Sequence, residues 1–420
     1  MRWIKKVDEP ILVKEVELQG NNMGWLVIDS LGNGQAVGGV RLGEYVTLEE
    51  VKNLAAEMTR KFSFLNLPIG GAKAGICCSP LLSEWERKDL FFRFGNGLGS
   101  LLREEIYLPG TDMGTFPGDI DWLFQGADVA RRSQGNSLDS GYYTAVSVFS
   151  ALQAISSVFG IPLSGARIGI EGLGKVGLRL FHLACEHGLK VVTVSTRIGA
   201  LYSPHGLDPE QITDLARDYG DNLVSHYHGA NLIQCEELFE QDLEILCPCA
   251  GLYPIHPGNI DKVRAKIIIP GCNVAAAPEV EERLYNRGII YLPGFVSNSG
   301  GVLCYILSNY GFTEEEIGNF LSQGIRQKVS SLLVRAKKAD EFPAATALKI
   351  VNENQEKFTC ESEARLKGQL SLGVIRFRKS GPKEMIRTFF WPLVKDTLSE
   401  PPSLRRQLAK KILFERLFQS

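Results

Sequence analysis

The sequence has little net charge and no long uninterrupted apolar segment. Its 46 lysines and arginines nearly balance its 48 aspartates and glutamates, so the net charge is only −2 and offers no general attraction to nucleic acid or anionic lipid. The first residues, MRWIKKVDEPILVKEVEL, lack the apolar core of a signal peptide. We also find no stretch of the roughly 18 uncharged apolar residues that a membrane helix requires. The sequence therefore predicts a cytoplasmic protein without a nucleic-acid partner.

Regular cysteine spacing is also missing. The nine cysteines are an odd number, and the pairs Cys77/Cys78 and Cys247/Cys249 are embedded in apolar runs. Such surroundings are typical of reduced core cysteines, and the alternatives are disulfides or a zinc site. We predict reduced cysteines and no bound metal.

The 420 residues are enough for two domains, and the sequence pattern changes near residue 140. Strand patterns over residues 12–42 and later helix patterns indicate a first α/β domain. Beyond residue 140, short apolar runs alternate with helix patterns, as in a parallel sheet covered on both faces. The predicted fold class is α/β: an N-terminal α/β domain, a Rossmann-type doubly wound domain, a helical return segment and a basic C-terminal helical extension, at residues 1–138, 139–325, 326–360 and 361–420.

A helix is predicted directly after residue 46. Thr47 and Glu50 have the spacing of a capping box. Lys61 lies at the edge of a single apolar stripe, formed by Val51, Leu54, Ala55, Met58 and Phe62. The glycine-rich run LNLPIGGAKAGI then predicts a turn that carries Lys73, and a second helix follows at about 82–103. The punctuation of LPGTDMGTFPGD indicates an irregular exposed loop.

The run ARIGIEGLGKVGLRLFHLACEHG carries a G-x-G-x-x-G motif between a predicted strand and a predicted helix. Gly172 permits a tight turn, Gly174 lets a pyrophosphate approach the backbone, and Gly177 lets the helix and strand pack closely. Lys175 and Val176 separate the last two glycines, at the positive end of the helix. The motif predicts dinucleotide binding, with a plain strand-to-helix turn as the alternative.

The end of the next predicted strand is where an acidic residue usually binds the adenosine ribose. Here the sequence offers Ser195, Thr196 and Arg197, without a carboxylate. Because Arg197 has the charge to pair with a 2′-phosphate, NADP is expected at least as much as NAD. The alternative is that Arg197 is a solvated loop residue.

The two lysines of the first half suggest proton-transfer chemistry. Burial lowers the pKa of a lysine, and a second ammonium nearby lowers it further. Lys61 and Lys73 would form such a pair, and an amine with a pKa near 7 or 8 is a useful base at neutral pH. The alternative is that Lys73 caps a turn or extends its ammonium to water.

Several motifs in the same order resemble the glutamate, leucine, phenylalanine and valine dehydrogenase family. They are TRKF, LPIGGAKAGICCSP, GTDMGT, EGLGKVG, GALYSPHGLD, AKIIIPGCNVAAAPE and RGIIYLPGFVSNSGGV, and the likeness covers roughly residues 10–310. The resemblance implies a substrate-binding and oligomerisation domain before the Rossmann domain. It also implies reversible oxidative deamination of an amino acid with NAD or NADP by a homo-oligomer.

The resemblance also implies roles for individual residues. Lys61 would bind the α-carboxylate, Lys73 would activate water, and Asp112 would carry protons to and from the amino nitrogen. Asn298 would hold the nicotinamide carboxamide, and Ala250 and Asn273 complete the expected cofactor-binding set. The alternative for Lys61 is a solvated charge at the edge of the helix. The alternative for Asp112 and Asn298 is that they are ordinary turn formers.

The sequence departs from the glutamate enzymes of this family at the substrate pocket. Val37 replaces the lysine that precedes the glycine pair Gly38 and Gly39, and Tyr305 replaces a serine. A substrate carboxylate buried without a cation would cost several kcal/mol, so we expect an apolar side chain over Val37 and Gly39. The pocket therefore looks closer to the leucine and phenylalanine branch. The rival function is an inactive paralogue that acts as a nucleotide-binding regulatory or scaffolding subunit.

The basic extension at residues 361–420 ends in PSLRRQLAKKILFERLFQS, which has an amphipathic helical pattern. Three alternatives remain: packing on its own domain or a neighbouring subunit, docking a partner protein, or touching an anionic membrane.

Overall fold

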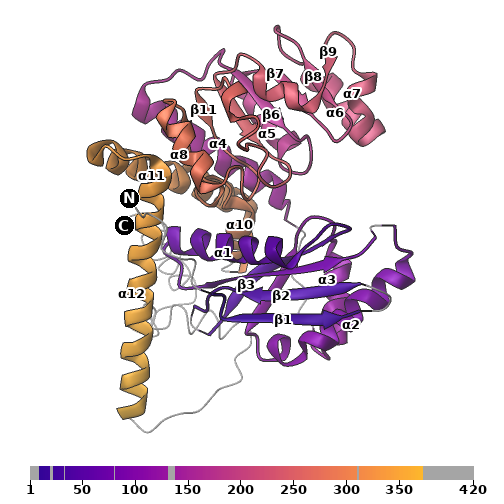
Figure 1. Cartoon of the computed structure of the whole chain (residues 1–420), viewed down its shortest axis with the longest axis vertical. Helices are drawn as coiled ribbons and strands as arrows, with labels where there is room; N and C mark the ends of the chain where they lie inside the picture. The colour runs from indigo at the N-terminus through magenta and orange to yellow at the C-terminus, as the bar shows by residue number, and fades with distance from the viewer. Residues whose placement is uncertain are drawn as a thin grey trace. The chain divides into compact units, whose positions relative to one another are not determined.

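The computed structural model describes residues 9–18, 22–32, 34–79, 81–130, 138–309 and 312–371, which form two compact units (Figure 1). The first contains the described residues up to 130 and those from Ile350 onward, and the second contains residues 138–349. The domain limits expected at 325/326 and 360/361 fall inside helices α11 (Glu314–Ala339) and α12 (Pro343–Ser371). They stay proposals.

A five-stranded mixed sheet forms the centre of the first unit. Its strands are β1 (Leu12–Glu17), β2 (Met23–Ile28), β3 (Ala36–Gly43), β4 (Gly70–Cys77) and β5 (Tyr107–Thr111), in the order β1-β2-β4-β3-β5. The pairs β1/β2 and β2/β4 are antiparallel, whereas β3 pairs in parallel with both β4 and β5. The parallel strands are joined by helices, as the chain direction requires.

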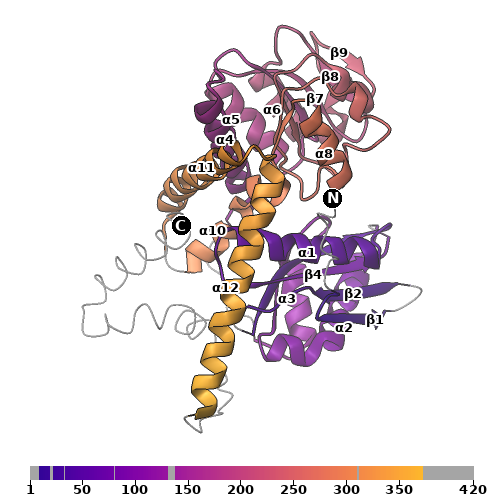
Figure 2. The same cartoon turned by 60° about the vertical axis from the view of Figure 1, so that its left-hand side comes forward.

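Helices cover both faces of this sheet (Figures 1 and 2). Helix α1 (Leu48–Phe64) lies along one face, chiefly over β4 and β2. Helices α2 (Glu84–Arg103) and α3 (Pro117–Gly126) cover the opposite face, where Phe91, Phe94 and Leu123 join the main core. Because strand side chains alternate between faces, every second residue of β3 and β4 points toward the α1 side.

Three local predictions for this unit need correction. Lys73 does not lie in a glycine turn but within β4, a strand paired on both edges. The segment Leu108–Thr111 is not irregular, because it belongs to β5. The capping box is half formed: Thr47 caps the backbone N–H of Glu50, but the Glu50 carboxylate pairs with Arg41 instead.

The second unit is doubly wound around a seven-stranded sheet in the order β12-β11-β10-β6-β7-β8-β9. The parallel sheet expected from the short apolar runs is confirmed, and its strands are β6 (Arg167–Glu171), β7 (Lys190–Ser195), β10 (Ile245–Pro248), β11 (Ile267–Ile268) and β12 (Ile290–Tyr291). The antiparallel strands β8 (Ala200–Tyr202) and β9 (Asn231–Ile233) extend one edge and were not predicted. The chain reverses its direction of travel through the sheet between β6 and β10.

The helices of the second unit are mostly short. The α-helices besides α11 are α4 (Ser140–Phe159), α5 (Gly177–Glu186), α6 (Pro209–Tyr219), α7 (Leu223–His226), α8 (Pro278–Asn286), α9 (Gly294–Ser297) and α10 (Gly300–Asn309). The 3₁₀ turns are η1 (Gly220–Asn222), η2 (Cys235–Glu240) and η3 (Ile260–Lys262). The mixed sheet of the first unit and the doubly wound sheet of the second confirm the predicted α/β class with a Rossmann-type domain.

Helix α4 is long and apolar, as its sequence indicates. It is the one helix of the described chain with the length and composition to cross a membrane. However, 67% of its 18-residue apolar segment is buried inside the protein. It packs against α5, α10 and α11, as a core helix does.

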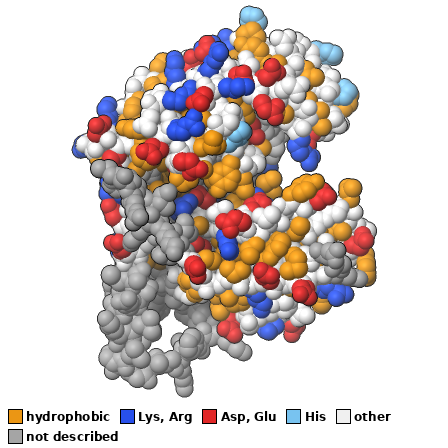
Figure 3. Space-filling view, in the orientation of Figure 1, with side chains coloured by type: hydrophobic (Ala, Val, Ile, Leu, Met, Phe, Trp, Pro, Cys, Tyr) orange, Lys and Arg blue, Asp and Glu red, His pale blue; other side chains and the backbone are white. Residues whose placement is uncertain are grey.

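Surface and terminal features complete the description. Apolar side chains are exposed on the first unit (Figure 3), including Leu81, Trp85 and Phe116.

The eight cysteines whose side chains are described are free thiols. Asn354 of α12 donates a hydrogen bond to the Ser63 carbonyl of α1. The predicted amphipathic helix near the C-terminus lies outside the described residues.

Gly71 tests the packing of α1 on β4. A Cβ at this position would lie 2.1 Å from the Thr59 backbone nitrogen, so Gly71→Ala must push α1 away from the sheet. We expect a loss of about 1–3 kcal/mol of unfolding free energy, measured by denaturant titration. Gly118→Ala is the control, because its Cβ meets no atom within 4 Å. Equal midpoints for both variants would contradict the packing described.

Candidate active site

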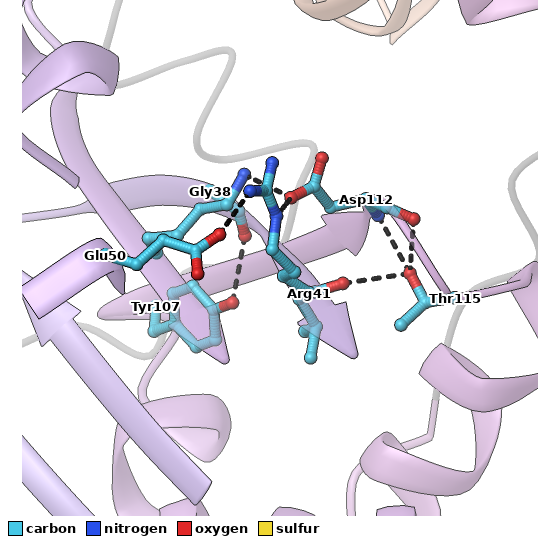
Figure 4. Close-up of polar contacts among 8 residues, drawn as sticks. Gly38, Arg41, Glu50, Tyr107, Asp112 and Thr115 are labelled. Carbon is cyan, nitrogen blue, oxygen red and sulfur yellow. Dashed lines mark hydrogen bonds and ion pairs between the residues drawn. The ribbon is translucent and has the colours of Figure 1, made fainter. Parts of the chain in front are cut away.

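A buried charge cluster lies on the α1 side of the first sheet. The Lys73 Nζ is 2.7 Å from Asp112 Oδ2, and the Arg41 Nε donates to the same oxygen at 2.9 Å. Arg41 also pairs with Glu50 of α1 (Figure 4). The exposed fractions of the Lys73 and Arg41 side chains are 5% and 6%, so these charges interact with little water between them. We call Arg41, Glu50, Lys73 and Asp112 the charge cluster.

The loop after β5 fixes the position of Asp112. Its backbone N–H donates to the Thr115 hydroxyl at 2.8 Å, and that hydroxyl lies 2.9 Å from the Val40 carbonyl. Gly114 has φ +76°, and a Cβ there would lie 2.1 Å from the Leu42 carbonyl oxygen. Arg87 of α2 donates to the Gly114 carbonyl at 2.6 Å. The second half of the GTDMGT motif therefore holds its aspartate against the end of β3.

Two glycines lie beside Lys73 in the sheet. The parallel register pairs Val37 with Gly71 and Arg41 with Gly75, which puts Lys73 level with Gly39. Gly39 in turn pairs with Gly110 of β5. A Cβ at Gly110 would meet no atom within 4 Å, so the sheet surface there is open. At Gly39, by contrast, a Cβ would lie 3.0 Å from the Asp112 Cβ, so glycine is needed there for Asp112 to reach Lys73.

Lys61 lies near this row of residues, at the last turn of α1. Its exposed fraction is 6%, and burial together with the Lys73 charge lowers its pKa to about 8. Burial also lowers the pKa of Lys73, against the opposing influence of Asp112, and Arg41 acts in the lowering direction. The predicted lysine pair is therefore present, but the like charge that matters most for Lys73 is Arg41.

Asp112 is the acid of the cluster. Burial acts to raise its pKa, but Lys73 and Arg41 outweigh burial and hold the pKa well below its ordinary range. The carboxylate is therefore ionised at neutral pH. Its contribution to stability is present above the ordinary aspartate pKa of about 3.9 and is lost as the pH falls through the lowered value.

Arg41 and Glu50 are site residues that the sequence analysis missed. The available signal was strand alternation, because Arg41 lies two residues after Gly39 and four after Val37 on the same face of β3. Glu50 was assigned to a capping box, and only the contact with Arg41 shows its other role.

The second unit contains the predicted nucleotide motif. Gly172 has φ +88°, and a Cβ at Gly177 would lie 1.9 Å from the Gly172 carbonyl oxygen, so both positions require glycine. A Cβ at Gly174 would meet nothing within 4 Å. Helix α5 starts at Gly177, directly after Val176, and Lys175 lies in the turn before it. Gly172 and Gly177 thus have the geometry expected for a tight turn and for close helix packing, and the open space at Gly174 would admit a pyrophosphate.

The switch point of the sheet lies at this turn, between β6 and β10. A Cβ at Gly172 would approach Ala250, and the Ala250 N–H donates to the Glu171 carboxylate at 3.1 Å. Burial raises the pKa of Glu171 to about 7. Ligands of doubly wound sheets bind at such a point. Ala250 is therefore where the sequence predicted it, and Glu171 is an additional residue there.

Asn298 and the end of β7 also fit a dinucleotide. The Asn298 side chain donates to the Cys272 carbonyl at 2.7 Å, while its Oδ1 is buried without a partner among the described residues. That acceptor suits a carboxamide N–H, and Asn273 follows Cys272 in the same loop. The Ser195 hydroxyl accepts from the Gly172 N–H at 3.0 Å. Thr196 and Arg197 follow Ser195 directly. The residues present fit NAD or NADP.

A cationic substrate cluster on one unit and a dinucleotide fold on the other define an NAD(P)-dependent dehydrogenase. Residues 10–128 match the model of the Glu/Leu/Phe/Val dehydrogenase dimerisation domain, and residues 135–357 match that of Glutamate/Leucine/Phenylalanine/Valine dehydrogenase. The chain belongs to this family. It is an amino acid dehydrogenase that acts on CH–NH₂ groups with NAD or NADP, as the sequence predicted.

Individual relatives agree with this assignment. Glutamate dehydrogenase of Thermotoga maritima is 33% identical over 293 residues, 66% of this chain and 70% of that protein. The leucine-bound hetero-hexameric glutamate dehydrogenase of Thermus thermophilus has a TM-score of 0.72 at 25% identity, covering 84% of this chain and 90% of that one. L-tryptophan dehydrogenase of Nostoc punctiforme shares the fold, with a TM-score of 0.59 at 22% identity over 82% and 96% of the two chains.

These comparisons bear on the expected branch of the family. The relatives named from sequence are glutamate dehydrogenases, so overall similarity does not support a position near the leucine and phenylalanine enzymes. That expectation now rests on the pocket residues alone.

Asp112→Asn tests the charge cluster. The substitution leaves Lys73 and Arg41 facing each other without their shared counter-ion, so we expect the unfolding free energy at pH 7 to fall by about 3–5 kcal/mol. Deamination should fall about 10²- to 10⁴-fold. Asp89→Asn, which breaks a surface pair with Arg93 on α2, should change stability by less than about 1 kcal/mol. Equal effects of the two changes would contradict a buried cluster.

Proposed function

We propose that the chain catalyses the reversible NAD(P)-dependent oxidative deamination of an apolar L-amino acid, aliphatic or aromatic, to its 2-oxo acid and ammonia. The observation that carries the proposal is the Lys73–Asp112 contact at 2.7 Å beside the glycines of β3 and β5. A homo-oligomer built through residues 10–128 is part of the proposal, supported by the match to a dimerisation domain.

Lys61 binds the α-carboxylate of the substrate. No carboxylate of the described chain lies within ion-pair distance of Lys61, so its ammonium is available to a substrate anion. The open surface at Gly110 leaves space in which the substrate α-carbon approaches the Lys73 amine. The Lys61 ammonium thereby orients the substrate over the sheet.

Proton transfer is divided between Asp112 and Lys73. Asp112, which is ionised, accepts the proton that the substrate ammonium must lose. Bound NAD or NADP supplies the hydride acceptor. Neutral Lys73 then takes a proton from water as the water oxygen bonds to the imine carbon, and Asp112 returns its proton to the departing nitrogen. The C–N bond breaks as the new hydroxyl group loses its proton to solvent, which gives the 2-oxo acid and ammonia. The lowered pKa of Lys73 suits this amine to accept the proton from water.

The sheet surface beside Gly39 and Gly110 favours an apolar substrate side chain. Val37 of β3 pairs with Leu108 of β5, and strand alternation puts both on the side of Gly39 and Gly110. Arg41 is the nearest cation on β3, but Asp112 and Glu50 already balance its charge. A glutamate side-chain carboxylate would therefore be buried here without a counter-ion, at a cost of several kcal/mol. Val37 and Leu108 therefore support a pocket of the kind expected for the leucine and phenylalanine enzymes, although overall similarity does not.

The rival function, an inactive nucleotide-binding paralogue, has less support. A chain without chemistry has no use for two lysines of lowered pKa around one ionised aspartate, because such a cluster costs stability. Reduced cofactor formed with any amino acid decides against the rival.

Lys73→Ala should lower the deamination rate by about 10²- to 10⁴-fold and leave cofactor affinity unchanged. In the wild type the rate should rise with pH through a lysine pKa below the ordinary 10.5, because only the neutral amine accepts a proton. Stopped-flow absorbance of the reduced nicotinamide measures both. Lys338→Ala, at an exposed position of α11, is the control. An unchanged rate in Lys73→Ala removes Lys73 from the mechanism.

The pH dependence of amino acid binding tests Lys61. Its ammonium is charged below its pKa of about 8 and neutral above it, so KM should rise from that pH upward. Lys61→Arg keeps the charge to higher pH, and the rise in KM should move upward with it. A KM that is flat between pH 7 and 10 would contradict the role of Lys61.

Val37→Lys tests the substrate class. The wild type should prefer leucine, valine, phenylalanine or tryptophan over glutamate in kcat/KM. The new lysine supplies a cation beside Gly39. The ratio of kcat/KM for glutamate to kcat/KM for leucine should therefore rise by at least 10-fold, about 1.4 kcal/mol. Val37→Met, an apolar change of similar reach, should leave glutamate disfavoured. A wild type that prefers glutamate would overturn the pocket argument.

A further inference from the structure

The predicted cofactor-discriminating residue, Arg197, is already engaged by a carboxylate. Its Nε donates to Asp221 Oδ2 at 2.6 Å, and its Nη2 is 2.5 Å from the same oxygen. Asp221 belongs to η1, 24 residues further along the chain. The Thr196 hydroxyl donates to the Asp221 backbone carbonyl at 2.8 Å, which ties η1 to the end of β7.

This end of β7 lies against the glycine motif. The Leu173 N–H donates to the Ser195 carbonyl at 2.8 Å, and the Ser195 hydroxyl accepts from the Gly172 N–H. A surface hollow of about 280 Å³ connects the two regions. Gly174, Lys175 and Asp221 are among the residues that line it, and Arg197 is not. A ligand that approaches Gly174 therefore meets Asp221 rather than the Arg197 guanidinium.

We propose that Asp221 is the acidic residue for the adenosine ribose, delivered from η1 instead of the end of β7, and that it makes the enzyme favour NAD over NADP. A carboxylate accepts hydrogen bonds from ribose hydroxyls and repels a 2′-phosphate. The proposal rests on dinucleotide binding by the second unit and not on the identity of the amino acid.

The charges around the hollow support this direction. Arg197 is neutralised by Asp221, and Arg179 is neutralised by Asp139 at 2.9 Å. Lys175 is left as the remaining positive charge of the lining. A pyrophosphate already needs cationic and N–H partners at this turn, so little positive charge is left for a further phosphate dianion.

The test is equilibrium binding of two adenosine fragments, adenosine 5′-monophosphate and adenosine 2′,5′-bisphosphate, to the full-length protein by titration calorimetry. The wild type should bind the monophosphate at least 10-fold more tightly. Asp221→Asn, which keeps the backbone carbonyl that Thr196 contacts, should move the ratio of the two dissociation constants at least 10-fold toward the bisphosphate. Arg197→Ala should leave the affinity for the monophosphate within 2-fold.

Asp261→Asn is the matched control, because it removes the same charge from another exposed pair in the second unit, with Arg283, and should leave the ratio unchanged. Tighter binding of the bisphosphate by the wild type would overturn the proposal. So would an Asp221→Asn ratio equal to that of Asp261→Asn. Fragment binding needs no amino acid, so these outcomes are independent of the proposed substrate.

Discussion

The shared hydrogen bonding of Asp112 to Lys73 and Arg41 is the interaction on which the first unit depends. Three cations, Arg41, Lys61 and Lys73, are almost completely buried there, and burial of unpaired ammonium groups would cost several kcal/mol each. Two carboxylates, those of Asp112 and Glu50, reduce that cost without removing it. The residual cost is what lowers the pKa values of the two lysines. A protein that only had to be stable would bury apolar residues in their place, so the cluster indicates chemistry.

The fold supports this cluster through close backbone packing. Gly71 lets α1 pack directly on β4, Gly39 lets the backbone of Thr111 and Asp112 approach β3, and the sheet surface at Gly110 is open. The Thr115 hydroxyl and Arg87 fix the loop that carries Asp112. In the second unit the absence of a side chain matters in the same way at Gly172, Gly174 and Gly177. Both units therefore use glycine where a ligand must approach the backbone, as the family assignment requires.

Much of this could be predicted from the sequence, because the signals were local. The strands at residues 12–42, the helix after Thr47 and the strand-turn-helix at Gly172 each have a short-range pattern. The failures were long-range. Lys73 was placed in a turn because its glycines resemble turn residues, whereas they are strand positions under a helix. Glu50 looked like a cap because its partner, Arg41, lies on another element. Asp221 carries no motif at all, and only the packing of η1 on β7 brings it to Arg197.

The central claim is that the Lys73 amine loses its proton far more easily than an exposed lysine does. Competitive labelling with trace amounts of acetic anhydride across a pH series, with each lysine quantified by peptide mass spectrometry, measures this directly. We predict that Lys73 titrates below its ordinary value of 10.5. A titration of Lys73 at or above 10.5 would contradict the claim.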